Sequence, residues 1–275
     1  MEMKYSDIVL IRSGGDISSG IIERLYNCGF KVVVLEIGNP SSIRREVCFG
    51  EAVYRKRMTI GNLTSVLVEG IKEMEAALAE GEIPVLVDEK GKYIDILKPF
   101  ALIDAILAKR NLGTKIDMAP ITIGVGPGFY AGRDVHAVIE TKRGHHLGKV
   151  IYEGKAIKNS GIPGNIGGFT RERVIHSQWE GNIKNISKIG DAVKKGQVIA
   201  LIGENKVLAT IDGILRGIIR DGYFVTKGFK IADIDPRMDE YENCFTISDK
   251  ARSVGGGVLE ALITLKNRIS GGNNG

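Results

Sequence analysis

The stretch DIVLIRSGGDISSGIIERLYNCGFKVVVLE, residues 7–36, decides the fold of the amino-terminal half. It opens with an apolar run that predicts a strand, and the pair Gly14-Gly15 predicts a tight turn. Apolar residues at helical spacing follow, namely Ile17, Ile21, Ile22 and Leu25, before a second apolar run at 32–35. Strands that are apolar throughout are typical of a parallel sheet with both faces covered, so we expect a βαβ unit here.

The glycine turn of this stretch is a candidate phosphate-binding site. Gly14, Gly15 and Asp16 stand where the helix begins, and backbone N–H groups at a helix N-terminus bind anions. Glu36 follows Gly15 by 21 positions, where dinucleotide-binding domains carry a ribose-binding carboxylate. Of the three glycines in the G-x-G-x-x-G fingerprint, only the middle one is present. The alternative is a turn that binds nothing, in which Asp16 caps the helix.

A second glycine turn stands further along the chain. Residues 121–125 predict a strand, and Gly126-Pro-Gly128 predicts a tight turn at its carboxyl end, the end at which parallel sheets bind ligands. Arg133, Asp134 and His136 follow closely, and we expect them to flank this turn. Imidazole and carboxylate suit an acid/base pair, an anion site or a metal site. We assign Asp134 and His136 as candidate catalytic residues and Gly126, Gly128 and Arg133 as candidate ligand-binding residues.

Composition excludes several classes of protein. The chain has 275 residues, 36 of them glycine, and its 43% share of hydrophobic residues excludes a disordered or collagen-like chain. The formal net charge of +5 is too small to indicate a nucleic-acid or membrane-binding protein, although it suits a small anionic ligand. We therefore expect neither nucleic acid nor a membrane among its partners.

The cysteines and the amino terminus indicate the cell compartment. The three cysteines form no C-x-x-C motif, which argues against a disulfide framework and a zinc site. We predict no metal site. The apolar runs are strand-sized, and the first residues lack the apolar core of a signal peptide. The expected location is the cytoplasm.

An internal repeat marks the carboxyl-terminal half. Residues 181–202 match residues 213–234 at a constant offset of 32, with glycines and aliphatic residues aligned. The pattern GDAVKKGQVIA, residues 190–200, resembles the biotinyl/lipoyl-carrier fold, the barrel-sandwich hybrid. Carriers hold their acceptor lysine at the tip of a protruding hairpin, and the only candidate here, Lys206, stands in a shorter segment. We therefore expect no covalent lipoyl or biotin and two hairpins related by an approximate two-fold axis.

The last part of the chain contributes further candidate residues. A final helix is predicted from the stripe Val258, Leu259, Leu262 and Leu265. Ser248 and Lys250 at its entrance, together with the glycines at 255–257, are candidate anion-binding residues. Cys244 is a candidate catalytic thiol, for which a buried inert thiol is the alternative.

Together these patterns predict an α/β domain followed by an all-β module. We expect a Rossmann-like parallel-sheet domain over residues 1–175 and a barrel-sandwich-hybrid-like module over 176–236. A segment over 237–270 would pack its helix back on the α/β domain.

Five motifs give the chain a resemblance to a known family. They are IRSGGDISSG (11–20), RREVCFGEAVY (44–54), AKRNLGT (108–114), GVGPGFYAGRDVHAVIETKRGH (124–145) and CFTISDKARSVGGG (244–257), and they resemble the YqeB family. Such proteins are associated with selenium-dependent molybdenum hydroxylases, and the amino-terminal part is similar to the Rossmann domain of XdhC accessory proteins. The resemblance implies a role in maturation of a client hydroxylase, and it carries over no catalytic residue.

Three hypotheses of function follow. In the first, the chain is a maturation factor that handles an anionic molybdopterin-type cofactor, or sulfur or selenium for it. In the second, it is a non-catalytic scaffold that docks on the client enzyme. In the third, it is an NAD(P)-dependent oxidoreductase that binds a nucleotide at Glu36 and the glycine turn. The residues leave open whether the chain is an enzyme, which ligand it binds and whether it forms a homo-oligomer.

Overall fold

The computed structural model describes residues 7–271 and divides the chain into two compact units. The first, which we call the sheet unit, takes the described parts of 1–40, 48–159 and 247–275. The second, the β unit, takes 41–47 and 160–246. The sequence-based division placed 160–175 with the α/β domain and did not separate 41–47, because such a discontinuous unit leaves no composition shift to detect.

The sheet unit is built on a nine-stranded sheet in the order β3-β4-β5-β2-β1-β6-β7-β8-β9. The edge strands β3 and β9 are antiparallel to their neighbours, and all other pairs are parallel. The strands are β1 (Ile8–Arg12), β2 (Lys31–Glu36), β3 (Arg57–Ile60), β4 (Leu63–Val68), β5 (Ile83–Val87), β6 (Ala101–Asp104), β7 (Ile121–Val125), β8 (Ala137–Ile139) and β9 (Val150–Ile151). The predicted strand–turn–helix–strand unit is confirmed as β1, α1 and β2.

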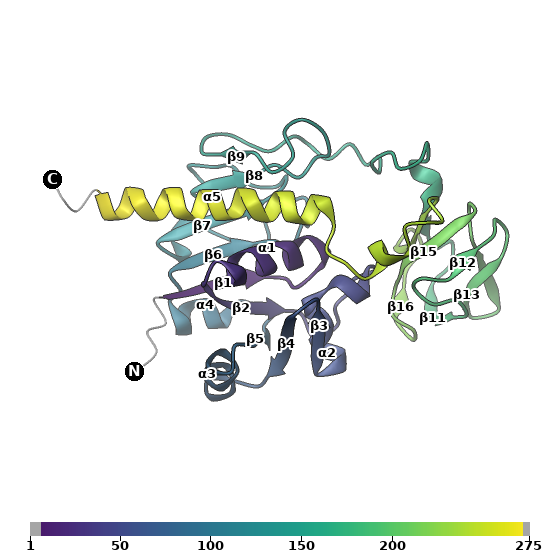
Figure 1. Cartoon of the computed structure of the whole chain (residues 1–275), viewed down its shortest axis with the longest axis horizontal. Coiled ribbons are helices and arrows are strands. Elements are labelled where there is room, and N and C mark those ends of the chain that lie inside the picture. Colours follow the sequence, from purple (N-terminus) through teal and green to yellow (C-terminus); the bar gives the residue numbers. More distant parts are fainter. Residues whose placement is uncertain (1–6, 272–275) are drawn as a thin grey trace. The chain divides into compact units, whose positions relative to one another are not determined.

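Helices cover both faces of this sheet (Figure 1). On one face α1 (Asp16–Asn27) and α5 (Asp249–Gly271) lie side by side over the central strands. On the other face, α3 (Ile71–Ala79) and α4 (Lys92–Leu97) bury apolar residues against the same strands. The short helices α2 (Ala52–Arg55), η3 (Phe49–Glu51) and η4 (Ile116–Met118) complete the unit. The expected final helix is present, and it packs within the sheet unit.

Helices α1 and α5 approach closely because glycines line their contact. A Cβ atom on Gly20 would lie 2.5 Å from the backbone of Ala251, and one on Gly255 would lie 2.5 Å from the carbonyl oxygen of Gly20. One on Gly257 would lie 2.1 Å from the carbonyl oxygen of Gly148. The glycines at 255–257, predicted as candidate anion-binding residues near the helix start, lie inside α5. Two of them serve close packing.

The β unit consists of two four-stranded antiparallel sheets, β10-β17-β15-β12 and β14-β13-β11-β16. The strands are β10 (Val174–His176), β11 (Gly181–Asn185), β12 (Ala192–Val193), β13 (Val198–Ile202), β14 (Asn205–Leu208), β15 (Gly213–Ile218), β16 (Phe224–Val225) and β17 (Lys230–Asp235). The short helices η2 (Arg45–Val47), η5 (Arg171–Arg173) and η6 (Tyr241–Cys244) also belong to it. One apolar cluster, which includes the fully buried Ile199, Leu215 and Ile231, forms the core of this unit.

The internal repeat corresponds to two sets of three strands. At the offset of 32, β11, β12 and β13 match β15, β16 and β17. Within each set the first strand pairs with the third, while each short middle strand pairs with the first strand of the other set. The two halves are therefore interlocked, whereas the sequence predicted two simple hairpins.

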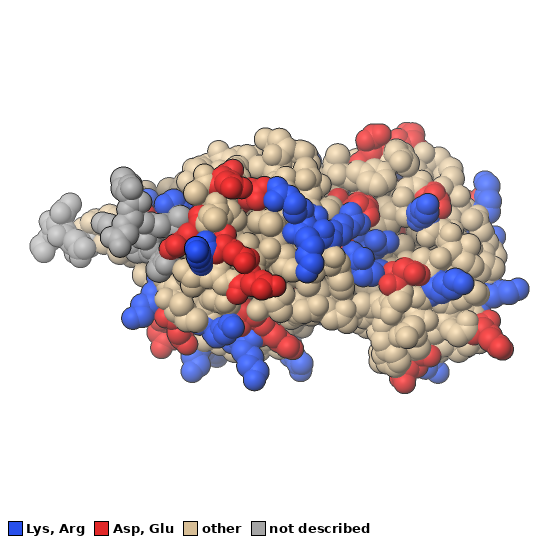
Figure 2. Space-filling view, turned by 90° about the horizontal axis from the view of Figure 1, so that it is seen from below, with Lys and Arg blue, Asp and Glu red and all other residues tan. Residues whose placement is uncertain are grey.

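Charged side chains of both signs lie in small groups on the face shown in Figure 2. Within residues 7–271 no helix is long and apolar enough to cross a membrane. None of the three cysteines, which all lie within the described residues, forms a disulfide; Cys28 is exposed, and Cys48 and Cys244 are buried.

Candidate functional site

The carboxyl edge of the parallel strands carries most of the predicted ligand-binding residues. Strand β1 ends at Arg12, and the turn Ser13-Gly14-Gly15 leads directly into α1. Ser13 has a φ angle of +89°, in the left-handed region that side chains rarely adopt. Strands β1 and β6 are neighbours whose connections leave toward opposite ends of the sheet, so a topological switch point lies between them. Ligands of open α/β sheets bind at such a point.

The side chain of Glu36 fixes the glycine turn through hydrogen bonds to the backbone. Its Oε2 accepts a hydrogen bond from the Gly14 N–H at 2.7 Å, and its Oε1 accepts one from the Ile37 N–H at 2.9 Å. Burial raises the pKa of this carboxyl group, although the two backbone hydrogen bonds act in the opposite direction. Both oxygens of the predicted ribose-binding carboxylate are thus engaged within the protein.

The space beside Gly14 is filled by protein. A Cβ atom on Gly14 would lie 2.4 Å from the nitrogen of Gly50, whose N–H donates to the Gly14 carbonyl at 2.9 Å. A side chain at position 14 would overlap the 49–50 segment, so this packing requires glycine. The approach of a phosphate to this side of the turn is therefore closed.

The starts of α1 and α5 come together at the carboxyl edge. Burial lowers the pKa of Lys250, and the positive charge of Arg143 adds to this, while the carboxylates of Asp16 and Glu140 act in the opposite direction. Arg143 forms two hydrogen bonds to Asp249, at 2.8 and 3.1 Å. Three predicted ligand-binding residues, Asp16, Ser248 and Lys250, therefore share one neighbourhood, since Ser248 accepts the N–H of Ala251 in the first turn of α5.

The turn Gly126-Pro-Gly128 also lies at the carboxyl edge, directly after β7. Gly126 and Gly128 have φ angles of +81° and +126°, which favour glycine. A Cβ atom on Gly128 would lie 2.8 Å from the backbone of Arg110, so this turn packs against the loop that follows β6.

His136, one member of the predicted acid/base pair, does not flank this turn. His136 precedes β8, and its Nδ1 accepts the N–H of Thr122, the second residue of β7, at 3.0 Å. It therefore lies at the amino edge of the sheet, opposite Gly126. The physical reason is that β7 and β8 are parallel neighbours. The connection between them must therefore run back from the carboxyl edge of the sheet to its amino edge before β8 begins. Burial lowers the pKa of His136.

Asp134 belongs to the same crossing segment. Its Oδ2 accepts the N–H of Tyr130 at 2.8 Å, and Arg133 donates to both of its oxygens, at 2.8 and 3.2 Å. The hydrogen bond from Arg133 lowers the pKa of Asp134. The pair Arg133–Asp134 thus shapes the turn at 130–134.

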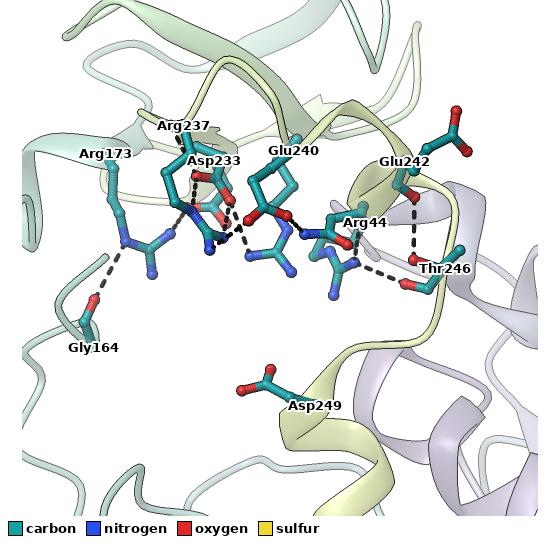
Figure 3. Close-up of polar contacts among 12 residues, drawn as sticks. Arg44, Gly164, Arg173, Asp233, Arg237, Glu240, Glu242, Thr246 and Asp249 are labelled. Atoms are coloured by element: carbon teal, nitrogen blue, oxygen red, sulfur yellow. Dashed lines mark hydrogen bonds and ion pairs between the residues drawn. The ribbon is translucent and has the colours of Figure 1, made fainter. Parts of the chain in front are cut away.

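Cys244, the predicted catalytic thiol, lies in the β unit and is close enough to Arg44 and Arg216 to interact with their charges. Figure 3 shows the polar contacts of Arg44 and of the charged residues around it. The thiol is 1% exposed; burial raises its pKa, and the positive charges of Arg216 and Arg44 act in the opposite direction. In the same set, Arg173 pairs with Asp233 at 2.6 Å and Arg237 with Asp235 at 2.8 Å. Both aspartates project from β17, two residues apart, which places them on one face of that strand.

Sequence reasoning missed a polar network at the switch point. Arg12 Nη1 donates to Asp104 Oδ2 at 3.0 Å and to Thr114 Oγ1 at 2.6 Å, and the Thr114 hydroxyl donates to Asp104 at 2.6 Å. Arg12 ends β1 and Asp104 ends β6, so each is the first charged residue after an apolar run. That signal was present in the sequence. Within residues 7–271 no group of three or more His, Cys, Asp or Glu side chains could hold a metal ion.

Comparison with known proteins identifies one informative relative. No known protein family profile matches the chain. It is 51% identical over 261 residues to the uncharacterized protein YqeB of Escherichia coli (strain K12), an alignment that covers 95% of the chain and 48% of that protein. The chain is therefore a homologue of YqeB that spans about half the length of this relative.

Two solved structures of the ectoine utilization protein EutE (DoeB) from Ruegeria pomeroyi are distantly similar. The product-bound structure has a TM-score of 0.23 and 9% identity, covering 83% of this chain and 57% of that one. The apo structure has a TM-score of 0.26 and 10% identity, covering 82% and 85%. Similarity at this level supports no statement about function.

Proposed function

We propose that this homologue of YqeB is an accessory protein for a selenium-dependent molybdenum hydroxylase, and that it binds the client's anionic molybdopterin-type cofactor. We infer the client enzyme from the resemblance of the chain's sequence motifs to the YqeB family. The binding site we propose is the carboxyl edge of the sheet unit. One observation carries this choice: the first turns of α1 and α5 lie together there, with Lys250 between charged neighbours.

Positive groups gather at this edge. Each helix carries a partial positive charge at its first turn. Lys250 and Arg143 add positive side chains, and burial of Lys250 strengthens its interaction with any charge nearby. Asp16, Asp249 and Glu140 place three negative charges beside these two positive ones, so an anion binds here by displacing a carboxylate. A phosphate-bearing ligand that displaced Asp16 or Asp249 from these cations would take over their interactions.

The proposal includes a finer description of the two units. The order β5-β2-β1-β6-β7 among parallel strands, with helices on both faces, supports a Rossmann-like domain. The interlocked repeat of the β unit supports a barrel-sandwich-hybrid module. Lys206 lies on β14, opposite Leu201, in a hairpin with a short turn. That position supports a module without a lipoyl or biotinyl group.

Deleting the gene tests the proposal. We expect the hydroxylase polypeptide to stay abundant while its activity and its bound pterin fall together. Normal hydroxylase activity in the deletion strain would refute the maturation role.

Point variants returned to the deletion strain test the site. Lys250→Gln is expected to restore little activity, because the partly buried cation at the helix starts is lost. Lys266→Gln, the same change near the other end of α5, is the matched control and is expected to restore activity fully. His136→Ala, at the amino edge, and Asp134→Asn test the acid/base hypothesis. If Lys250→Gln restores activity and His136→Ala does not, the site lies at the amino edge.

A further inference from the structure

Arg12 is held in one position at the switch point. One of its nitrogens, Nη1, donates hydrogen bonds to Asp104 and Thr114. These two residues are buried, with 2% and 1% of their surface exposed. Asp104 is fixed in turn, since its Oδ1 accepts the N–H of Ile106 at 3.2 Å. A guanidinium anchored at one end loses little conformational entropy when its other end binds a ligand.

The other end of Arg12 is open. Within residues 7–271, Nε and Nη2 of Arg12 make no hydrogen bond to protein, and neither is a buried unpartnered atom, so both reach solvent. The Arg12 side chain as a whole is only 11% exposed. Nε and Nη2 form one side of the planar fork, the geometry that pairs with two oxygens of a phosphate or carboxylate.

The loop after β6 adds positive charge beside this arginine. Between 105 and 115 the chain carries Lys109, Arg110 and Lys115, all exposed, and no Asp or Glu. Because Asp104 neutralises Arg12, the loop and the pair together carry a formal charge of +3. This excess favours a dianion over a single carboxylate.

Hydrogen bonds within the same loop fix its conformation. Asn111 accepts the N–H groups of Gly113 and Thr114 through its Oδ1, and its Nδ2 donates to the Thr114 carbonyl at 2.7 Å. Leu107 and Lys109 adopt φ angles of +61° and +63°, which the surrounding structure must enforce. The loop is thus preformed around Thr114, the residue that anchors Arg12.

We infer that Arg12 and the 105–115 loop form the subsite for a phosphate or diphosphate group of the ligand. This inference rests on the proposed function and names the part of the cofactor that the switch point binds. Arg12 contacts the phosphate through Nε and Nη2, and Thr114 is a positioning residue that acts through Arg12.

Binding of inorganic pyrophosphate to the full chain, measured by isothermal titration calorimetry at low salt, tests this subsite. Arg12→Lys keeps the charge and removes the fork, and we expect it to weaken binding roughly 10- to 100-fold. Arg57→Lys, on the exposed edge strand β3, is the matched control and should bind like the wild type. Wild-type protein that binds no pyrophosphate, or equal binding by Arg12→Lys, would overturn the inference.

Two further variants keep the test decisive if Arg12→Lys does not fold. Thr114→Val removes the anchor and is expected to weaken binding about tenfold, and Thr114→Ser should restore it. Replacing Lys109 and Lys115 together by Gln should flatten the salt dependence of binding. Unchanged binding in both Thr114→Val and the double variant would overturn the subsite. These binding measurements are independent of hydroxylase activity, so a failed subsite leaves the maturation role standing, and a failed maturation role leaves the subsite standing.

Discussion

At the scale of single residues, Glu36 shows how one side chain fixes a turn. It is 8% exposed and accepts the backbone N–H groups of Gly14 and Ile37. Its raised pKa means that the folded chain binds a proton more tightly than the unfolded chain does. Stability is therefore expected to fall as the pH rises from the ordinary glutamate pKa through the raised one.

Glu36→Gln is expected to remove that fall, because glutamine does not titrate. It also turns an amide N–H₂ toward one of the two backbone donors, which should cost about 1–3 kcal/mol in unfolding free energy at mildly acidic pH. Urea unfolding from mildly acidic to neutral pH measures both effects, with the exposed Glu89→Gln as control. An unchanged pH slope in Glu36→Gln would assign the slope to another group.

The spacing of Glu36 from the turn was readable in the sequence. The sequence did not show that Glu36 bonds to the turn itself and not to a ligand. The packing of the turn depends on Gly50, which lies against Gly14 and comes from a later segment of the chain.

At the scale of elements, apolar periodicity predicted β1, α1, β2, β7 and the apolar stripe of α5, since these elements bury continuous or helically spaced residues. It failed where tertiary contact decides. The glycines at 255–257 were candidate anion-binding residues near a helix start, yet they lie inside α5, where two of them permit contacts that any side chain would block. His136 was placed beside Gly126 by sequence distance, whereas the parallel pairing of β7 and β8 separates them.

The three consecutive glycines of α5 make a sharp comparison. Gly257→Ala should destabilise the chain by about 1–3 kcal/mol, because its methyl group would overlap the Gly148 carbonyl and force the backbone apart. Gly256→Ala meets nothing within 4 Å and should stabilise it by about 0.5–1 kcal/mol through lower backbone entropy in the unfolded chain. Thermal and urea unfolding give both values. Equal effects at the two positions would contradict the packing role.

At the scale of the whole molecule, the chain leaves the sheet unit after β2, contributes 41–47 to the β unit and then returns. Arg44 anchors this excursion, since it is 8% exposed and its Nη2 donates to the carbonyls of Asn243 and Thr246 at 2.9 and 3.4 Å. Arg45 donates to the Ile218 carbonyl at 2.8 Å. These partners lie about 170 to 200 positions away in sequence, so no local pattern could predict them.

If the two units are separate cooperative bodies, a defect in this anchor should stay within one of them. Arg44→Ala leaves two carbonyls without their buried donor and opens a void, which we expect to cost the β unit about 2–4 kcal/mol. Hydrogen exchange followed by mass spectrometry should then speed up in β15 and at 241–246, while β1 and β2 keep wild-type rates. Arg57→Ala, on the exposed edge of the sheet unit, should change neither region. Faster exchange in β1 and β2 by the same factor as in β15 would mean that the chain unfolds as a single body, because only global opening exposes both units to the same extent.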